Sequence, residues 1–356
     1  MDEMRIDEAR ALWAPEGVYL NTASYGLPPR PAWDALQAAL ADWRGGRTSW
    51  ERWGDATESA RASSAALCGV PVEWVAVGAN VSSFVGLVAA ALPDGAHVLS
   101  TEAEFTSALW PFMAQRRGVE VECVPVARLA EAIDAGTDLV SFSAVQSATG
   151  EVADLEAVVA AAEHHGALTL LDATQACGWL PLAGSRFDAV VCAGYKWLVS
   201  PRGVAFMSVR PELLERLTPH AAGWYAGADP HESYYGPPLR LAADARRLDS
   251  SPAWFSWVGA APALELLLDI GVESIQAHDV HLANLLRAGL GLPPGDSAIV
   301  SAEIPGAEER LRELPVMAAV RAGRLRTSWH LYNTEDEVEL LLGRLARPRP
   351  VAPAAR

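Results

Sequence analysis

One potentially reactive residue of this sequence is a lysine that lies between two aromatic residues. Lys196 follows the apolar run 189–193 in the stretch DAVVCAGYKWLVSPRG, which spans 188–203. Taking an ammonium group out of water costs several kcal/mol or forces the group to lose its proton. Lys196 therefore either ends a strand in contact with solvent or is needed as a neutral amine.

Two other apolar runs end in residues of chemical interest. Asp172 closes the run ALTLLD, and Gln175 follows it in the next turn. A helix-sized connection separates Asp172 from Lys196, so their strands can be neighbours and their ends can face one pocket. Asp172 could instead cap the following helix. Gly78 closes the run EWVAVG before a helix that opens near Asn80, and a glycine turn leading into a helix N-terminus favours an anion.

A lysine, an acid and an anion site together are what pyridoxal 5′-phosphate requires. The lysine forms an imine with this cofactor, the acid keeps the pyridine nitrogen protonated, and the anion site holds the phosphate. Phe105 follows the apolar run AHVLS and could stack on the cofactor ring, although a phenylalanine in the core is the alternative. The sequence therefore predicts pyridoxal phosphate as the cofactor.

Seven apolar runs are expected to form the strands that position these residues. They span 73–78, 96–100, 119–123, 138–143, 167–172, 188–192 and 203–209. Amphipathic helical segments alternate with them, which predicts an α/β fold with a mostly parallel, seven-stranded sheet and helices on both faces. Ligands of such sheets bind at the carboxyl ends of the strands.

The pattern changes after about residue 235, where two long helical segments lead to a short strand and then to a final strand and helix. This indicates a second, smaller α/β domain. We therefore predict a large cofactor-binding domain over 16–235 and a small domain made of 1–15 and 236–346. The tail 347–356 has too little apolar surface to pack and is expected to be disordered.

Composition narrows the possible partners and the compartment. The chain has 356 residues and a net charge of −16, which disfavours nucleic acid and anionic membranes as partners. Its four cysteines, which form no CxxC pair, fit buried thiols in a reducing compartment. With no basic leader and no uncharged run of about 18 residues, we expect a soluble, cytoplasmic protein. The adjacent His164 and His165 cannot share one metal, and no metal is predicted.

The order of motifs along nearly the whole chain resembles the class V aminotransferase group of fold-type I pyridoxal phosphate enzymes. This group includes cysteine desulfurases, kynureninases and isopenicillin N epimerase. The motifs are YLNTASYGLPP, GANVSS, EFTS, SAVQSATG, DATQA, GYKWL with PRG, and RTSWHLYNT. The resemblance implies that Lys196 forms the imine, that Asp172 pairs with the pyridine nitrogen and that Gln175 lies near the ring hydroxyl. It also implies that Ala79 and Asn80 present the phosphate cradle.

The same resemblance implies where the substrate binds. Ser147 approaches the ring or the substrate, and Arg326 holds the substrate α-carboxylate with its planar guanidinium. Asn21 and Tyr25, from the first motif, are expected beside the substrate. Family sites are completed by a second subunit, so we expect a homodimer.

Several positions depart from the cysteine desulfurase pattern. Tyr195, with Phe105 or Thr106, stands where desulfurases carry histidines, and this combination is similar to kynureninase. The segment 315–326 contains no cysteine before the carboxylate-binding arginine, so persulfide chemistry is not expected. Trp224 and Ser251 stand where relatives lend a phosphate contact to the partner subunit, although packing in the core is an equal alternative.

The leading functional hypothesis is an enzyme that binds an amino acid as an imine and breaks a C–S or C–C bond. Transamination is the close alternative, and epimerisation is also open within the family. A nucleotide-dependent oxidoreductase would need a GxGxxG turn after the first strand, which the sequence lacks. A catalytically inactive scaffold is disfavoured because Lys196, Asp172 and Arg326 are all present.

Overall fold

A computed structural model describes residues 5–311 and 315–345 of the chain. Its centre is a seven-stranded sheet in the order β2-β8-β7-β6-β5-β3-β4, which confirms the predicted strands and the mostly parallel arrangement. The exception is β8, which runs antiparallel to both β2 and β7. The strands are β2 (Val75–Gly78), β3 (His97–Thr101), β4 (Glu120–Val124), β5 (Leu139–Ser143), β6 (Leu168–Asp172), β7 (Ala189–Ala193) and β8 (Ala205–Val209).

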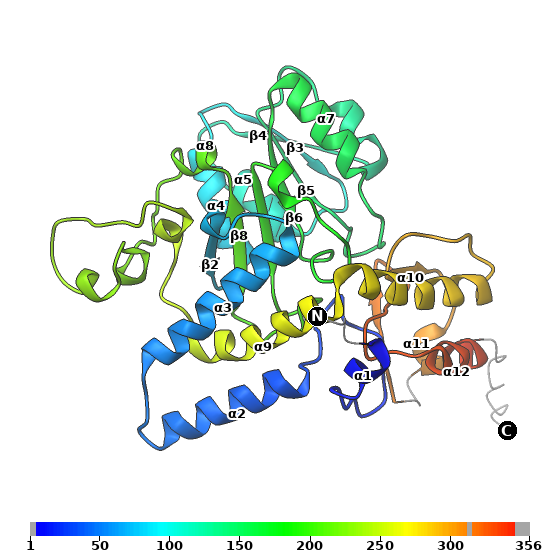
Figure 1. Ribbon diagram of the computed structural model, residues 1–356. Helices are drawn as coiled ribbons and strands as arrows, with labels where there is room; N and C mark the ends of the chain where they lie inside the picture. Colours follow the sequence, from blue (N-terminus) through cyan, green and yellow to red (C-terminus); the bar gives the residue numbers. More distant parts are fainter. Residues whose placement is uncertain (1–4, 312–314, 346–356) are drawn as a thin grey trace, which may run out of the picture.

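Helices cover both faces of this sheet (Figure 1), because successive strand residues point to opposite sides and both sides are apolar. Val190 of β7 packs in the first core, while its neighbour Val191 packs in the second. The first face carries α3 (Trp50–Cys68), α6 (Leu129–Ala132), α7 (Leu155–His165) and α9 (Trp254–Ile270), and α2 (Arg30–Arg44) lies against α9. The second face carries α4 (Val81–Ala91), α5 (Thr106–Met113) and α8 (Pro211–Leu214).

A smaller α/β unit lies beside the sheet, as predicted for the C-terminal part (Figure 1). Its antiparallel sheet has the order β11-β12-β9, and a third core joins it to the surrounding helices. The elements are α1 (Ile6–Arg10), β9 (Ile299–Ala302), α10 (Val272–Gly289), α11 (Ala307–Leu311), β11 (Ala319–Arg321), β12 (Arg324–Ser328) and α12 (Glu335–Leu345). A short strand near the N-terminus, β1 (Val18–Tyr19), pairs with β10 (Val316–Met317).

The predicted domain boundaries, 16–235 against 1–15 with 236–346, stay a prediction. Helix α9 follows the proposed boundary at 235, yet it packs along α2 and α3 of the large unit. The tail 347–356 lies outside the described residues.

The cysteines depart in one case from the expectation of buried thiols. Cys68, Cys177 and Cys192 are buried, but Cys123 is exposed, because its strand β4 is the edge of the sheet.

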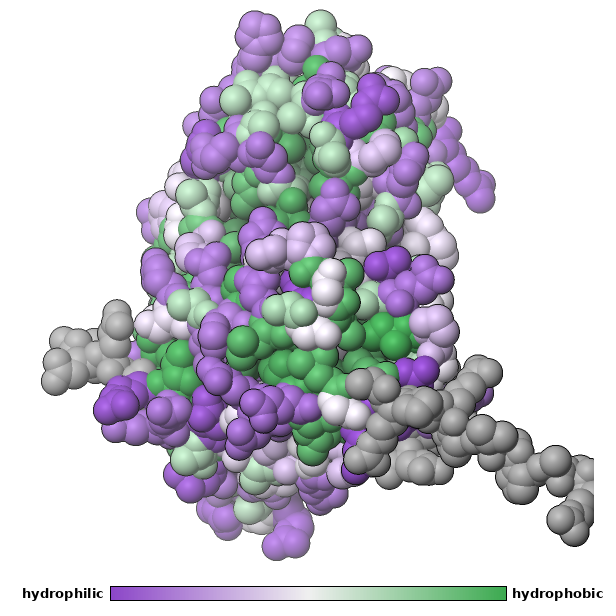
Figure 2. Space-filling view, turned by 90° about the vertical axis from the view of Figure 1, so that its right-hand side faces the viewer, coloured by the Kyte–Doolittle hydropathy of each residue, from purple (hydrophilic) through white to green (hydrophobic). Residues whose placement is uncertain are grey.

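Figure 2 shows a face of the molecule on which polar residues predominate at the top and bottom, with hydrophobic residues gathered between them. Within the described part of the chain no single helix is long and apolar enough to cross a membrane, although the bent pair α9 and α10 passes that test of length and composition together.

Candidate active site

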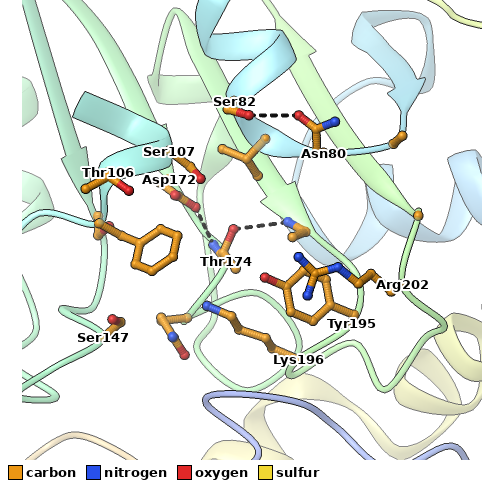
Figure 3. Close-up of a pocket in the computed structure, with 17 residues that line it drawn as sticks. Asn80, Ser82, Thr106, Ser107, Ser147, Asp172, Thr174, Tyr195, Lys196 and Arg202 are labelled. Atoms are coloured by element: carbon orange, nitrogen blue, oxygen red, sulfur yellow. Dashed lines mark hydrogen bonds between the residues drawn. The ribbon is translucent and has the colours of Figure 1, made fainter. Parts of the chain in front are cut away.

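A cavity of about 540 Å³ opens at the carboxyl edge of the large sheet (Figure 3). Its walls come from the ends of β5, β6 and β7, from the first turns of α4 and α5, and from the segment just before β8. The cavity therefore lies where ligands of parallel sheets bind. The predicted cofactor residues that line it are Ala79, Asn80, Phe105, Thr106, Ser147, Asp172, Gln175, Tyr195 and Lys196.

Lys196 enters this cavity from the turn that follows β7 (Figure 3). Its side chain is nearly buried, and Nζ lies 5.2 Å from the centre of the Phe105 ring and 5.8 Å from that of Tyr195. Burial lowers the pKa of this lysine to about 8, against the opposing attraction of Asp172. A substantial neutral fraction near neutral pH suits a lysine that must attack an aldehyde.

Lys196 is also the only lysine of the chain. The other strongly basic side chains are all arginines, whose guanidinium does not lose its proton in proteins. Composition alone could therefore have identified this residue, a signal that the motif analysis did not use.

Asp172 closes β6, and its strand is hydrogen-bonded to β7, which delivers Lys196. Asp172 Oδ1 accepts a 2.8 Å hydrogen bond from the main-chain N–H of Thr174, whose hydroxyl in turn accepts one from the N–H of Ala193. Burial raises the pKa of Asp172 to about 6, although the Thr174 hydrogen bonds act in the opposite direction. The carboxylate is thus fixed in direction and costly to keep charged unless a cation enters the cavity.

Gln175 lines the cavity, but neighbouring residues hold its amide. Its side-chain N–H donates to the carbonyl of Ala23 at 2.9 Å, and Oε1 accepts from the indole of Trp197 at 2.7 Å. The second amide hydrogen of Gln175 is not used in these bonds and is available to the ring hydroxyl. The contact with that hydroxyl stays a prediction.

The N-terminus of α4 forms the anion-binding wall of the cavity. Asn80 is the N-cap, and its Oδ1 accepts hydrogen bonds of 2.9 Å from the N–H and hydroxyl of Ser83 and from the hydroxyl of Ser82 (Figure 3). The residues at this helix terminus, Ala79 to Ser82, line the cavity. Main-chain N–H groups at a helix N-terminus and the helix dipole favour a phosphate.

The opposite wall is aromatic and hydroxylic. Phe105 precedes α5 and keeps 47% of its surface exposed, so its ring is available for stacking rather than packed in the core. Thr106 begins α5 beside it, and Ser147 faces Lys196 from the segment after β5 (Figure 3).

Arg326 reaches this wall from β12 of the small unit. Its guanidinium donates to the carbonyl of Ser147 at 2.6 Å and to the hydroxyl of Ser24 at 2.6 Å, and it lies 3.4 Å from Asn21 Oδ1. Burial lowers the pKa of Arg326 to about 10, and it contributes to the lowered pKa of Lys196. Tyr25, also predicted beside the substrate, lies against Tyr195 with ring centres 5.5 Å apart.

Two predicted cofactor residues, Trp224 and Ser251, do not line the cavity of their own chain, and the predicted substrate residues Asn21, Tyr25 and Arg326 are not among its lining residues either. Trp224 packs among aromatic side chains, with ring centres 4.9 Å from Trp50 and 6.4 Å from Trp254, and Ser251 is exposed. Their predicted contact with the phosphate of a partner subunit is untested in a single chain and stays a prediction.

One cation in the cavity was missing from the predicted site. Arg202 stacks its guanidinium on Tyr195 at 4.7 Å from the ring centre and lines the cavity (Figure 3). It lies there because β8 is antiparallel and so begins at the edge where β7 ends. The PRG motif after Lys196 contained this residue, but its position depends on the direction of the next strand.

These residues fit the cofactor that the sequence predicts. The cavity brings together a buried lysine with a lowered pKa, a buried acid with a raised pKa, an exposed aromatic face and a capped helix N-terminus. A primary amine, a pyridinium partner, a stacking face and a phosphate cradle are the four things pyridoxal phosphate needs.

Comparisons with known proteins agree with the chemistry of this cavity. The family model described as "Aminotransferase class-V" matches residues 18–304. The chain is 28% identical to the uncharacterized aminotransferase YcbU of Bacillus subtilis, over 84% of this chain and 85% of that protein. It is also 28% identical to isopenicillin N epimerase of Streptomyces clavuligerus, over 93% and 95%.

Solved structures show the same fold. A cysteine desulfurase from Thermococcus onnurineus NA1 superposes with a TM-score of 0.83 at 22% identity, covering 96% of this chain and 98% of that one. The cystine C–S lyase C-DES, in complex with cysteine persulfide, gives 0.84 at 22% identity, covering 94% and 98%. The chain therefore belongs to the class V aminotransferase family, and it is a pyridoxal phosphate-dependent enzyme of fold type I.

Proposed function

We propose that this enzyme is a lyase that cleaves a C–S or C–C bond in an α-amino acid and releases the fragment directly into solution. The observation that carries this proposal is the combination of Arg326 at the cavity rim with the lack of a thiol near it. Cys68, Cys177 and Cys192 are buried, and Cys123 lies on β4 at the far edge of the sheet. The structural likeness to a cystine C–S lyase supports the same reading.

The roles we propose for the residues follow from their geometry. The bound cofactor supplies an electron sink for negative charge at the substrate α-carbon. Arg326 binds the α-carboxylate, exchanging its bond to the Ser147 carbonyl for a stronger charge-assisted pair. Lys196 Nζ takes the α-proton and can return a proton to the leaving group. Asp172 holds the protonated pyridine nitrogen, and Phe105 covers the ring.

Cleavage of a C–S bond by this route has a balanced outcome. The sulfur leaves with the bonding electrons and takes up a proton, and hydrolysis of the remaining three-carbon fragment gives a keto acid and ammonia. With no protein thiol at the site, no persulfide is formed on the enzyme. Transamination differs, because the amino group stays on the cofactor and no ammonia appears.

One experiment distinguishes these outcomes. The holoenzyme is incubated with single amino acids, and keto acid, ammonia, thiol and the cofactor absorbance are followed together. A C–S lyase releases thiol, keto acid and ammonia over many turnovers without a second substrate, and a C–C lyase releases its carbon fragment and a shorter amino acid in the same way. One equivalent of keto acid with loss of the aldehyde form would instead establish an aminotransferase. Exchange of the α-hydrogen with inversion and no release would establish the epimerase, the activity named for the Streptomyces clavuligerus relative.

We further propose that the enzyme is a cytoplasmic homodimer. The segment 223–241 projects from the large unit (Figure 1) and exposes Tyr235 and Leu239 at 89% and 80% of their surfaces. Exposed apolar side chains on a projecting segment are typical of a surface that a second subunit covers. Sedimentation of the holoenzyme as a monomer with full activity would refute the dimer.

A further inference from the structure

The turn that carries Lys196 is fastened to the small unit through the next residue. The main-chain carbonyl of Trp197 lies 3.1 Å from Nε2 of His330, which follows β12. Trp197 and His330 are both fully buried. The position of the lysine turn therefore depends on a side chain far away in the sequence.

A second buried residue completes this contact. Nδ1 of His330 lies 2.9 Å from Oδ2 of Asp279 on α10, and Asp279 is also fully buried. Oδ1 of Asp279 lies 2.9 Å from Nδ1 of His278, whose Nε2 faces the guanidinium of Arg10 at 3.4 Å. The network thus runs from α1 of the small unit to the backbone beside the lysine.

The partners of these rings fix the positions of their protons. Arg10 can only donate, so Nε2 of His278 accepts and its Nδ1–H donates to Asp279. The carbonyl of Trp197 can only accept, so Nε2 of His330 carries a proton. His330 therefore hydrogen-bonds the Trp197 carbonyl through Nε2 and contacts Asp279 through Nδ1.

The turn needs such a fastening because its backbone is not relaxed. Val199 is β-branched and buried, yet its φ is +44°, a conformation that such residues rarely adopt. On the other side, the N–H of Gly26 donates to the carbonyl of Tyr195 at 2.9 Å, and a Cβ at position 26 would lie 1.9 Å from the carbonyl oxygen of Lys196. A strained turn persists only where its surroundings hold it.

We propose that the hydrogen-bonded pair Asp279–His330 is a positioning device that holds the Trp197 carbonyl and thereby aims the Lys196 side chain into the cavity. The inference rests on Lys196 being the lysine that links to the cofactor. Neither residue of the pair lines the cavity, and His330 connects the small unit to the turn that carries Lys196. A misplaced amine reacts slowly even when the cofactor is bound.

The test measures the rate at which the apoprotein bonds covalently to added pyridoxal phosphate at saturation, by borohydride reduction and intact mass. His330→Phe keeps a ring of similar size but donates no hydrogen bond. Asp279→Leu removes the hydrogen-bond partner of His330 Nδ1. Both variants should form the bond on the order of tenfold more slowly or worse. Asp279→Asn should stay near the native rate, because its side-chain amide can still hydrogen-bond Nδ1 of His330 while Nε2–H donates to Trp197.

Two controls separate positioning from stability. Leu341→Ala removes a buried side chain of the small unit that lies in another core cluster, so it should destabilise the fold without slowing bond formation. In the Lys196→Ala background, His330→Phe should leave the affinity for pyridoxal phosphate unchanged, because the phosphate cradle at Asn80 is intact. Nitrogen-15 histidine spectra of the native protein should show a hydrogen-bonded Nε2–H on His330.

The outcomes are decisive in either direction. Native rates in His330→Phe, an equal slowing in Leu341→Ala, an equal slowing in Asp279→Asn and Asp279→Leu, or a His330 ring without a proton on Nε2 would each overturn the proposal. Reduction that adds no mass at Lys196 would instead overturn the assignment of the linking lysine, whatever His330 does. The slow His330→Phe and Asp279→Leu variants with a fast Asp279→Asn variant would support the positioning role.

Discussion

Two carboxylates of this molecule, Asp172 and Asp249, are buried to a similar degree but have different partners. Burial raises the pKa of each to about 6. Asp249 forms an ion pair with Arg61, with 2.6 Å between Oδ2 and Nη2, and it also accepts a hydrogen bond from the N–H of Val77 at 2.8 Å. Nη1 of the guanidinium donates to the carbonyl of Val75 at 2.6 Å, and Nε and Nη2 also donate to Glu58. This pair therefore has its hydrogen-bonding groups satisfied within the protein.

The pKa values of the two cations, Arg61 and Lys196, shift in opposite directions. Burial opposes the charge of Arg61, but Asp249 and Glu58 outweigh it and raise the pKa of the guanidinium. Burial lowers the pKa of Lys196 to about 8, and Nζ has no hydrogen-bond partner in the described ranges 5–311 and 315–345. The Arg61–Asp249 pair, which we call the closed pair, ties α3 to β2. Lys196 and Asp172, which we call the open pair, face the cavity and can still bind a third group. The direction of the cation's pKa shift thus separates a structural buried charge from a functional one.

Replacement of Lys196 by Met should give the largest effect of the open pair. The lysine cannot be replaced as the linking amine, so turnover should fall by at least about 10³-fold. The fold should not be weakened, because an ammonium group is removed from a buried place. Turnover and thermal unfolding of the same preparation measure the two effects, and a clear loss of stability would make Lys196 a structural residue like Arg61.

The closed pair should respond in the opposite way. Arg61→Met leaves Asp249 buried without its partner and should lower the free energy of unfolding by about 3–5 kcal/mol. Turnover per folded molecule should change little, since Arg61 lies outside the cavity. The double variant Arg61→Met with Asp249→Leu should recover a large part of the stability in urea unfolding. No recovery would mean that packing, not the unpaired charge, sets the loss.

Asp172→Asn should separate function from stability within one residue. Its pKa in the folded protein is about 6, above the reference value of 3.8, so the charged carboxylate costs stability above pH 6. This cost falls as the pH falls through 6 towards 3.8. The apoprotein variant should therefore be more stable than the native apoprotein by up to about 3 kcal/mol at pH 7, with no difference near pH 4. Turnover should fall, because the pyridine nitrogen loses its anionic partner; a fully active variant would leave Asp172 as a helix cap.

Arg326→Lys tests the cation at the rim. A lysine keeps the charge but loses the planar pair of donors, so amino acids should bind about tenfold to thirtyfold more weakly. Pyridoxal phosphate should bind as before, because Arg326 makes its hydrogen bonds with Ser147, Ser24 and Asn21 and none with α4. Spectral titration of the holoenzyme with amino acids and with matched amines measures both, and equal weakening for the amines would show that Arg326 does not read the carboxylate.

The smallest effect concerns pH. The amine of Lys196 is neutral above its pKa of about 8, so the apoprotein should react with pyridoxal phosphate about tenfold faster at pH 9 than at pH 7. Because Asp172 raises this pKa, the Asp172→Asn variant should show the rise at lower pH. Stopped-flow absorbance follows the reaction. A profile unchanged by the Asn substitution would show that the two groups do not interact.

The parts of the fold and site that sequence predicts are those set by local pattern. Each of the seven apolar runs became a strand, because period and length specify a buried strand without distant information. Asp172 and Lys196 follow neighbouring strands of one parallel sheet, so their ends meet at one edge. Asn80 caps its helix because an asparagine before an apolar helical run is a strong local signal.

The parts that escape prediction depend on distant chain segments. Arg202 lines the cavity only because β8 reverses direction, which the strand pattern does not reveal. The partners of His330 come from α10 and from the lysine turn, far away in sequence. Trp224 and Ser251 would need a second chain to reach a phosphate, and no property of one chain places them there.

The solitary lysine has a practical consequence for labelling chemistry. Reagents that acylate or alkylate amines find two kinds of target in most proteins of this size, surface lysines in large number and the N-terminus. In this chain the arginines carry the permanent surface cations, and the only side-chain amine is Lys196 in the cavity. An amine-directed fluorophore would therefore mark either the N-terminus or the active site. A probe that pyridoxal phosphate displaces would report cofactor occupancy without any mutation.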